Sequence, residues 1–467
     1  MTSGAVNALP RVRSIGPAFS RRDQGSRARG RGRAIVTIAR AGPCREGRGI
    51  AAGMRGVESE TRRTSGKSTG PSPGVSMAKP ARYYGVDGPS AVMAGEPGAL
   101  RIGMLGTRGV PARYSGFETC VEELGARLAE RGHAVTVYCR TPHVSHPGSA
   151  YRGMRLVKLP TIRRKHLDTI AHTLLSAVHA LGQRYDVALF FNVGNSPLTF
   201  IPRLGGQRVV LNVDGLDWKR RKWGRVARWY IRSCERWATW FPQRVVTDSR
   251  RVQQYYRERR GVASTYIAYG AVPMSVPAGE TLARLGLAPR RYILFVGRLV
   301  PENCAHHLVE AFTGLPTDMR CVIVGDAPYA DAYIRSLKAG ADPRVIFTGY
   351  LFGPGYRELL SSAYCFVETS EVGGTHPALL EAMASGCGVV VNDTPENLET
   401  IGEAGWSYSG ARGAPGLRTV LDQLLRDPAL VSRRAEQGLA RVRQHYSWDA
   451  VTEDYEQLFR ELLRAVR

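Results

Sequence analysis

The sequence lacks any run of about 18 consecutive apolar residues, the length that a membrane-spanning helix needs. Its eight cysteines are spread singly and form no C-x2-C pair, so neither a zinc module nor a dense disulfide framework is indicated. This usage favours a reducing compartment, and any membrane contact is expected to be peripheral. Acidic residues are also few: 65 Lys and Arg against 40 Asp and Glu give a net charge of +25, which favours an acidic partner.

The basic excess is concentrated near the start of the chain. The first 100 residues hold 17 basic and 6 acidic side chains, and residues 26–33 read SRARGRGR. No helical or strand periodicity continues through this segment, so we predict that residues 1–99 form a disordered Arg/Gly-rich tail. Two explanations stay open: a segment that binds RNA, or translated sequence upstream of a native start at Met77 or Met93.

From Arg101 onward, apolar runs alternate with amphipathic stretches, as in parallel sheets with crossover helices. With 467 residues, two or three domains are expected. The first series of expected strands is 102–105, 134–138, 155–159, 187–191, 208–212, 244–247 and 264–268. The second series is 292–296, 320–324, 345–348, 365–368 and 388–392. The expected helices are 117–130, 167–181, 226–241, 249–258, 305–312, 330–338, 356–361, 378–384, 417–425, 428–444 and 449–466.

Prolines and glycines mark a joint between the two series. Pro273 and Pro277 lie in a stretch with Gly270 and Gly279. We predict an α/β protein of two facing, doubly wound domains over 100–272 and 273–445. The remaining segment, 446–467, is predicted to hold a helix that crosses back to the first domain.

The first motif, GTRGVP, follows the first expected strand and precedes a helix that opens with Gly116. Gly106 and Gly109 would let backbone N–H groups approach an anion, and the helix N-terminus adds positive potential. Glu118 lies in the first turn of the same helix. The G-x2-G-x6-G spacing is neither a dinucleotide fingerprint nor a Walker loop. A tight turn without a ligand is the open alternative.

The second motif follows the first strand of the second series. Gly297 and Arg298 stand just beyond the carboxyl end of that strand, where an open parallel sheet binds its ligand, and Asn303 follows. The planar guanidinium of Arg298 would hold two phosphate oxygens at once. The alternative is a solvated surface arginine.

The third motif is EVGGTHPALLEAMA at 371–384, a glycine-rich turn that opens a helix. The N–H groups of Gly373, Gly374 and Thr375 would be available to a phosphate. Glu381 projects from the helix, and a carboxylate accepts two hydrogen bonds from the vicinal diol of a ribose. Taken alone, Glu381 would be read as a surface residue.

At these three places the sequence resembles the retaining, nucleotide-sugar-dependent glycosyltransferases of the two-Rossmann-domain (GT-B) type, family 4. Within them it resembles the branch of rhamnosyltransferases, whose first domain opens with a GTRGVP-type loop. The resemblance spans about residue 101 to the C-terminus and includes NVDGLDWK at 212–219 and YSW at 446–448. It implies an acceptor-side domain over 100–272 and a donor domain over 273–445.

The resemblance also implies roles for individual residues. The candidate catalytic residues are Arg298 on the diphosphate, Asp214, and Glu118. The candidate donor-binding residues are Gly106, Gly109, Gly116, Gly297, Arg298, Asn303, Gly373, Gly374, Thr375 and, on the ribose hydroxyls, Glu381.

The chain departs from the family pattern at three positions. Asn303 stands where the family has a second phosphate-clamping lysine, and Arg108 or Arg113 is the candidate for the missing charge. The family's E-x7-E pair is displaced, because Glu371 is two residues too early. Asp214 stands where many relatives have a histidine, and there it is expected to contact the sugar or the acceptor.

The predicted function is transfer of a hexosyl group, rhamnosyl by resemblance, from a nucleotide-diphosphate sugar to a saccharide or lipid-linked acceptor with retention. The donor is a co-substrate; no cofactor is expected and no D-x-D cluster calls for a metal. The expected pathway is the synthesis of cell-surface polysaccharide. The expected location is the cytoplasm, including the inner face of the cell membrane. The alternatives are a nucleotide-sugar epimerase of GT-B fold and a non-catalytic nucleic-acid-associated protein, although no specific nucleic-acid motif occurs.

A basic and aromatic stretch follows residue 218. One expected helical stripe comprises Val226, Tyr230, Cys234, Trp237 and Phe241, and a second comprises Arg228, Arg232 and Arg236. This combination suits the interface of an anionic membrane. A packed helix with its basic face in water is the alternative.

Overall fold

The computed structural model describes residues 98–113, 115–162, 167–220, 223–328 and 330–465. The predicted disordered tail, 1–99, lies outside the described residues except for its last two positions, and so do Met77 and Met93.

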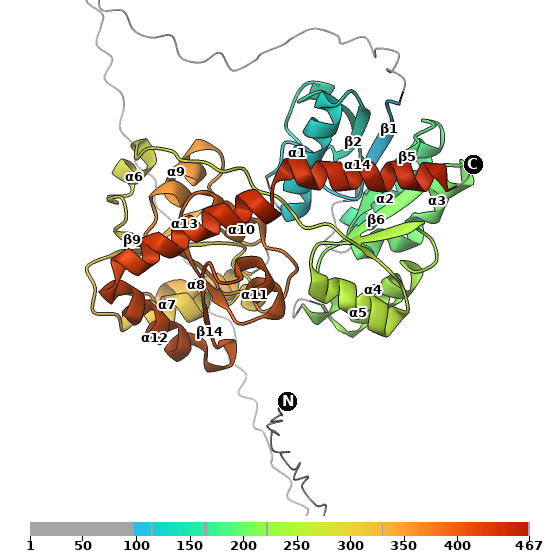
Figure 1. Ribbon diagram of the computed structural model, residues 1–467. Helices are drawn as coiled ribbons and strands as arrows, with labels where there is room; N and C mark the ends of the chain where they lie inside the picture. Colours follow the sequence, from blue (N-terminus) through green and yellow to red (C-terminus); the bar gives the residue numbers. More distant parts are fainter. Residues whose placement is uncertain (1–97, 114, 163–166, 221–222, 329, 466–467) are drawn as a thin grey trace, which may run out of the picture. The chain divides into compact units, whose positions relative to one another are not determined.

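The first sheet has the strand order β3-β4-β2-β1-β5-β6-β7-β8 in the described residues (Figure 1). Neighbouring strands are parallel, apart from the antiparallel pair β3 and β4. The central strand β5 is buried along its whole length, as expected for a sheet covered on both faces. The strands are β1 (Arg101–Leu105), β2 (Ala134–Arg140), β3 (Ala150–Tyr151), β4 (Met154–Leu159), β5 (Val187–Phe191), β6 (Arg208–Val213), β7 (Arg244–Thr247) and β8 (Thr265–Tyr266).

Crossover helices connect these strands. They are α1 (Gly116–Glu130), α2 (Asp168–Leu181), α3 (Phe200–Leu204), α4 (Arg225–Trp237) and α5 (Arg250–Arg260), with 3-10 helices η1 (Val193–Leu198) and η2 (Asp217–Lys219). Of these, α2 and α4 both contact η1.

The second sheet has the order β11-β10-β9-β12-β13-β14 and is parallel throughout the described residues. Its strands are β9 (Tyr292–Val296), β10 (Arg320–Val324), β11 (Val345–Gly349), β12 (Cys365–Glu368), β13 (Gly388–Asn392) and β14 (Trp406–Tyr408). Its helices are α6 (Glu280–Arg284), α7 (Ala305–Thr313), α8 (Asp331–Ala339), α9 (Pro354–Ser362), α10 (Pro377–Ala384), α11 (Pro395–Ile401), α12 (Gly413–Arg426) and α13 (Pro428–His445), with 3-10 helices η3 (Pro301–Asn303) and η4 (Gly410–Arg412).

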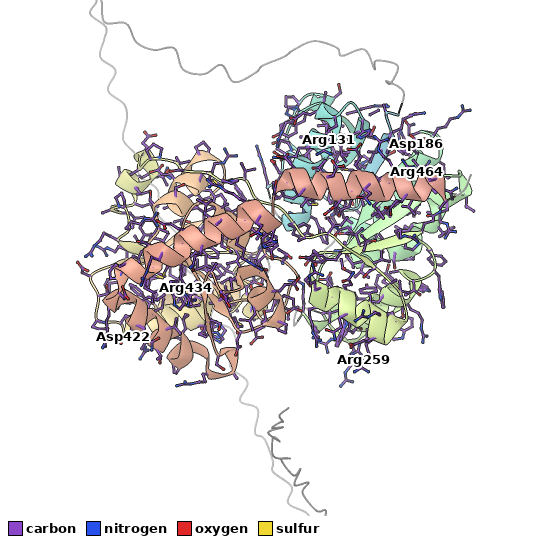
Figure 2. All side chains as sticks on the ribbon, in the orientation of Figure 1. Arg131, Asp186, Arg259, Asp422, Arg434 and Arg464 are labelled. Atoms are coloured by element: carbon purple, nitrogen blue, oxygen red, sulfur yellow. The ribbon has the colours of Figure 1, made fainter. Side chains whose placement is uncertain are left out.

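The C-terminal helix α14 (Trp448–Arg464) returns to the first sheet and packs on α1, as predicted (Figure 1). Arg131, at the end of α1, lies beside α14 (Figure 2) and pairs with Glu453 at 2.8 Å and Glu456 at 3.0 Å. On the buried face, Asn212 at the end of β6 donates to the hydroxyl of Tyr455. Within the described residues no helix is both long and apolar enough to cross a membrane.

The expected apolar stripe of α4 packs inward rather than facing a membrane. Cys234 is fully buried, the hydroxyl of Tyr230 donates to the carbonyl of Gly194, and Trp237 contacts the ring of Tyr230. Val226 is the exception, because it is exposed. The packed-helix alternative therefore describes this stripe.

Candidate functional site

The GTRGVP loop leads from β1 to α1, and its conformation requires both glycines. Gly106 and Gly109 have φ of 100° and 106°, where side chains are disfavoured. A Cβ at Gly106 would lie 2.5 Å from the carbonyl oxygen of Phe191, and one at Gly109 would lie 2.5 Å from Sγ of Cys139. Close packing within the domain is therefore sufficient to explain these two glycines.

Glu118 fastens this loop to the start of α1. Its carboxylate accepts the backbone N–H of Ser115 at 2.9 Å and that of Arg108 at 3.3 Å. The side chain is buried, and burial raises its pKa, although the charge of Arg108 and the two N–H groups act in the opposite direction. In this geometry Glu118 holds the loop in place.

Asp214 follows β6 and contacts the third motif. Its Oδ1 accepts the N–H of Gly374 at 3.2 Å, and its Oδ2 lies 3.8 Å from the guanidinium of Arg220. Arg220 is buried and donates to Asp217 at 2.6 Å. The N–H of Gly374 and the guanidinium of Arg220 therefore fix the orientation of the Asp214 carboxylate.

Asp248, which the sequence reasoning missed, is the second acidic residue here. It follows β7, is fully buried, and accepts the N–H of Thr375 at 3.0 Å. The hydroxyl of Thr375 donates to its backbone carbonyl at 2.5 Å. Burial, and then the charge of Asp214, raise the pKa of Asp248 well above its usual range. An aspartate directly after a strand that neighbours β6 was the signal that could have identified it.

Arg298 follows β9, in a loop held by its neighbours. The side-chain amide of Asn303 donates to the carbonyl of Arg298 at 3.0 Å. Asn303 thus shapes the arginine loop. Gly325, after β10, approaches the same loop so closely that a Cβ there would lie 1.9 Å from the carbonyl oxygen of Gly297. In the described part of the chain, no carboxylate forms an ion pair with Arg298.

The glycine-rich turn after β12 lies against this loop. The N–H of Glu371 donates to the carbonyl of Glu302 at 3.0 Å, and the hydroxyl of Thr369 donates to that of Asn303 at 2.5 Å. Gly374 must be glycine, because a Cβ would lie 2.2 Å from the carboxylate of Asp248.

The start of α10 contacts the start of α1. A Cβ at Gly116 would lie 2.7 Å from the ring of Pro377, so these two helix N-termini are in direct contact. The structure therefore brings the first and third motifs together, as well as the second and third.

Glu381 stands apart from these contacts. It lies one turn into α10, where its carboxylate accepts the hydroxyl of Tyr356 from α9. Burial raises the pKa of Glu381, while Tyr356 and the charge of Arg357 oppose that shift. The expected contact of Glu381 with a ribose stays a prediction.

The amide groups expected to hold phosphate are hydrogen-bonded to carboxylates of the chain. Gly374 and Thr375 donate to Asp214 and Asp248, and Arg108 donates to Glu118. Carboxyl groups thus already lie where main-chain N–H groups gather at a helix N-terminus. The arrangement is chemically suited to binding a diphosphate that replaces these carboxylates.

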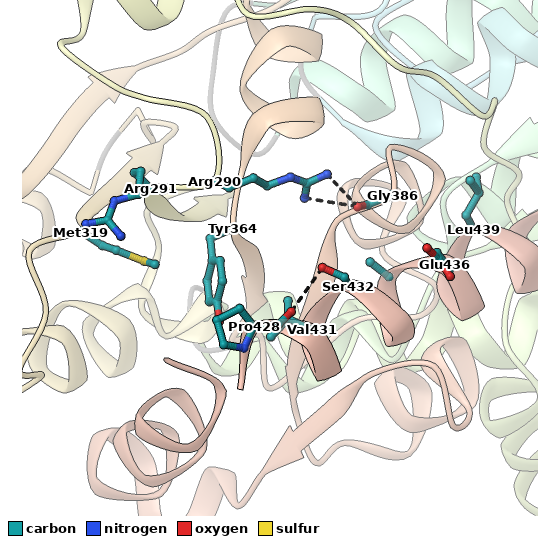
Figure 3. A pocket seen from close by; sticks show the side chains of 11 residues that line it. Arg290, Arg291, Met319, Tyr364, Gly386, Pro428, Val431, Ser432, Glu436 and Leu439 are labelled. Carbon is teal, nitrogen blue, oxygen red and sulfur yellow. Dashed lines mark hydrogen bonds between the residues drawn. The ribbon is translucent and has the colours of Figure 1, made fainter. Parts of the chain in front are cut away.

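Of two cavities in the described residues, one is lined by residues of the motifs and the other is not. A cavity of 60 Å³ at the GTRGVP loop is lined by Arg108, Arg113 and Glu118, among others. A larger cavity of 500 Å³ lies beside α13, where Arg290 reaches toward the carbonyl of Gly386 (Figure 3). Arg290 precedes β9, so this cavity is at the amino ends of the strands. Ligands of open parallel sheets bind at the carboxyl ends.

One cluster in the described residues has the ligand types of a transition-metal site. Ligand atoms of Cys304, His306 and His307 lie within 4.8 Å of one another. Nδ1 of His306 is 3.0 Å from the hydroxyl of Tyr333, and Nδ1 of His307 is 3.0 Å from that of Tyr408. The expectation that the reaction requires no metal stays a prediction.

Two family models match separate parts of the chain. Residues 290–427 match the model described as Glycosyl transferases group 1, and residues 101–272 match the model described as Domain of unknown function (DUF1972). Among curated proteins, alpha-maltose-1-phosphate synthase of Mycobacterium tuberculosis is 28% identical over 201 residues, which cover 39% of this chain and 51% of the relative. The chain thus spans about half the length of the curated relatives it matches.

Solved structures extend the likeness to both domains. Sucrose-phosphate synthase from Thermosynechococcus elongatus has a TM-score of 0.66 at 22% identity and covers 78% of this chain and 100% of its own. HepE from Anabaena, in complex with UDP and glucose, has a TM-score of 0.64 at 16% identity with the same coverage. These likenesses confirm the predicted GT-B fold of two α/β parallel-sheet domains.

Proposed function

We propose that this protein is a glycosyltransferase that moves a hexosyl group from a nucleotide-diphosphate sugar to a saccharide or lipid-linked saccharide. One observation carries the proposal. Arg298 and the N–H groups of Gly374 and Thr375 gather at the carboxyl ends of parallel strands, within the segment that matches group 1 glycosyl transferases. The UDP in the Anabaena structure supports a nucleotide donor.

The chain's own groups would stabilise the departing nucleoside diphosphate. As the bond between the sugar C1 and the phosphate oxygen breaks, negative charge develops on that oxygen. Preorganised N–H groups and a guanidinium aimed at it are the largest favourable term in such a step. Arg298 would bind two phosphate oxygens at once, while Gly374 and Thr375 donate from the start of α10.

Donor binding then requires a local exchange of partners. Asp214 and Asp248 accept the same N–H groups in this structure, so the phosphate and these carboxylates compete for them. Once displaced from Gly374, Asp214 is free to contact the sugar or the acceptor, the role that the family resemblance implies. Glu118 contributes by holding the GTRGVP loop.

The finer assignments rest on the motif resemblance. These are the family 4 membership, the rhamnosyl donor, the ribose contact of Glu381, and retention. In a retaining transfer the acceptor oxygen bonds to C1 on the face that the phosphate leaves, and a phosphate oxygen takes the acceptor's proton. A cytoplasmic enzyme of cell-surface polysaccharide synthesis is consistent with this chemistry.

A label-transfer assay tests the proposal. Radiolabelled nucleotide sugars are incubated with the protein and a membrane extract, and label is expected in lipid or polymer. Isomerised donor without transfer would instead indicate the epimerase alternative. Arg298→Ala should lower transfer at least a hundredfold, about 3 kcal/mol of transition-state stabilisation. Arg259→Ala on α5, exposed and outside the site (Figure 2), is the matched control and should retain activity.

A further inference from the structure

The helix α2 buries its polar face and exposes its apolar face, the reverse of an ordinary amphipathic surface helix. Its buried side chains are polar or small: His172, Thr173 and Ser176 are completely buried. Its branched apolar side chains face outward, with Val178 53% exposed and Leu174 and Leu175 exposed beside it. A surface helix of a globular protein normally buries its apolar stripe. The exposed stripe therefore points to a partner.

The exposed apolar face continues from α2 onto α3. Leu181 at the end of α2 packs beside Gly205, which directly follows α3. Leu204 on α3 is 76% exposed. Arg203 then donates to the carbonyl of Trp240 at 3.2 Å, which joins α3 to the segment after α4.

The outer face of α4 adds tryptophan side chains. Trp229 is 68% exposed, Val226 one turn before it is also exposed, and so is Trp240 in the segment that follows the helix. Of the fifteen large apolar side chains that are exposed in the described residues, eleven lie between Ile162 and Trp240. We call this region the outer apolar surface; it includes Leu174, Leu175, Val178, Leu204, Trp229 and Trp240.

The exposed charges of these helices are basic. Arg203, Arg225, Arg232 and Arg236 are exposed on α3 and α4. The acidic residues of these helices are engaged elsewhere.

The two acidic residues are Asp168 and Glu235. Asp168 pairs with Arg140 at 2.9 Å, and buried Glu235 pairs with Arg260 at 2.5 Å. A second copy of the chain on this surface would bring arginines against arginines, which disfavours self-association. Anionic headgroups complement the surface in both charge and apolarity.

We propose that the outer apolar surface docks on an anionic phospholipid bilayer. Leucine and tryptophan side chains would enter the boundary between headgroups and acyl chains, and the flanking arginines would contact lipid phosphates. A contiguous exposed patch of this kind is typical of an interaction surface rather than of free monomer surface. The proposal does not depend on glycosyl transfer, because none of the residues in the surface belongs to the candidate site.

Sedimentation of the full chain with phosphatidylcholine vesicles, with and without phosphatidylglycerol, tests the proposal. Binding should be stronger to vesicles that contain phosphatidylglycerol. The triple variant Leu174→Ser, Leu175→Ser, Val178→Ser should lower vesicle affinity at least tenfold. Leu398→Ser, at an exposed leucine of α11, is the matched control and should bind like the wild type.

The basic tail adds its own attraction to anionic lipid, so depth of insertion is measured as well. Brominated acyl chains should quench tryptophan fluorescence, and the double variant Trp229→Phe, Trp240→Phe should lose most of that quenching. Trp406→Phe, in β14 of the second sheet, should lose little.

For the charged residues, Arg225→Gln with Arg236→Gln should weaken binding to anionic vesicles, whereas Arg257→Gln with Arg259→Gln on α5 should not. Equal vesicle binding by the wild type and the triple variant would overturn the proposal. Dimerisation of the wild type that the triple variant abolishes, seen by sedimentation velocity, would also overturn it in favour of a second copy. Donor binding measured on the same variants separates failure of this surface from failure of the proposed transferase activity.

Discussion

Two aspartates determine which groups face the amides at the start of α10. Asp214 and Asp248 follow adjacent parallel strands and accept the N–H groups of Gly374 and Thr375. Burial raises the pKa of Asp248, and the charge of Asp214 adds to that shift. Asp248 therefore keeps its proton to a higher pH than an exposed aspartate does, and in that form it adds no negative charge beside a donor diphosphate.

Asp248→Asn should remove a pH dependence of stability. Because the folded-state pKa is raised, the carboxyl's contribution is fully present below about pH 4 and is lost as the pH rises toward the folded pKa. Asparagine still accepts the Thr375 N–H and carries no charge. We expect the unfolding free energy of the variant minus that of the wild type, both measured with urea, to increase as the pH is raised from about 4.5 to about 8.

Asp248→Ala is the informative counterpart. It leaves the buried N–H of Thr375 without its acceptor and should cost about 1–3 kcal/mol at about pH 4, with a smaller cost relative to wild type at about pH 8 because this variant also lacks the carboxyl. A wild-type protein whose stability relative to Asp248→Asn does not change with pH would contradict the raised pKa.

Gly325→Ala should disrupt the arginine loop. Gly325 has a φ of 139°, and a Cβ there would lie 1.9 Å from the carbonyl oxygen of Gly297, so the backbone must move. We expect a loss of about 2–4 kcal/mol in the free energy of unfolding, measured by urea titration. Gly340→Ala, where the nearest atom would be 3.8 Å away and φ is −97°, should cost less than about 1 kcal/mol. Equal effects of the two substitutions would contradict the packing described here.

The motifs predicted the positions of the glycine turns and of Arg298 in the fold better than the contacts made there. Arg298, Gly374 and Thr375 follow strands as predicted, because glycine turns and cations after strands have recognisable spacing; their roles in binding a donor stay predictions. The sequence reasoning missed Asp248, because an Asp-Ser pair before a helix also fits an ordinary N-terminal cap, the role that Ser249 fills. It assigned Glu118 to catalysis, but which backbone amides a carboxylate accepts depends on the folded loop.

At the scale of elements, the docking of α14 on α1 depends on charge as well as apolar packing. Burial alone would raise the pKa of Glu456, but hydrogen bonds from Arg460 and Arg131 lower it to about 2. The stabilisation is therefore present above about pH 4.5 and is lost as the pH falls toward 2.

Glu456→Gln tests this contact. The variant should lose about 1 kcal/mol of unfolding free energy at pH 7, and less as the pH falls to 3, in urea titrations. Glu461→Gln on the same helix is the control and should change stability little. A loss that is the same at pH 7 and pH 3 would show that the contact is not electrostatic.

Long elements with clear periodicity were predictable, and short ones were not. Each expected strand and helix coincides with an observed element, with the largest boundary differences at α4 and α12. The unpredicted strands β3 and β14 have two and three residues, too few to show an alternation. The short helices α3 and α6, with five residues each, have the same difficulty.

The inverted face of α2 shows where periodicity misleads. The sequence predicted a helix there correctly, but a pattern of leucines does not tell whether the stripe faces the core or the outside. Only the tertiary contacts, with His172 and Ser176 buried, decide its direction.

At the scale of the whole molecule, the three motifs follow the carboxyl ends of strands in the two sheets and contact one another there. Contacts such as Gly116 with Pro377 and Asp214 with Gly374 join residues that lie far apart in the sequence. The fold class followed from alternating strands and helices, whereas these contacts depend on how the two domains pack.

Titration calorimetry with a panel of nucleoside diphosphates at low salt tests the central claim most directly. We expect the full chain to bind at least one of them, and Arg298→Ala to weaken that binding at least tenfold, or about 1.4 kcal/mol. Arg259→Ala should leave the affinity unchanged. A wild-type protein that binds none of the panel, or an Arg298→Ala variant that binds as tightly as wild type, would contradict the account.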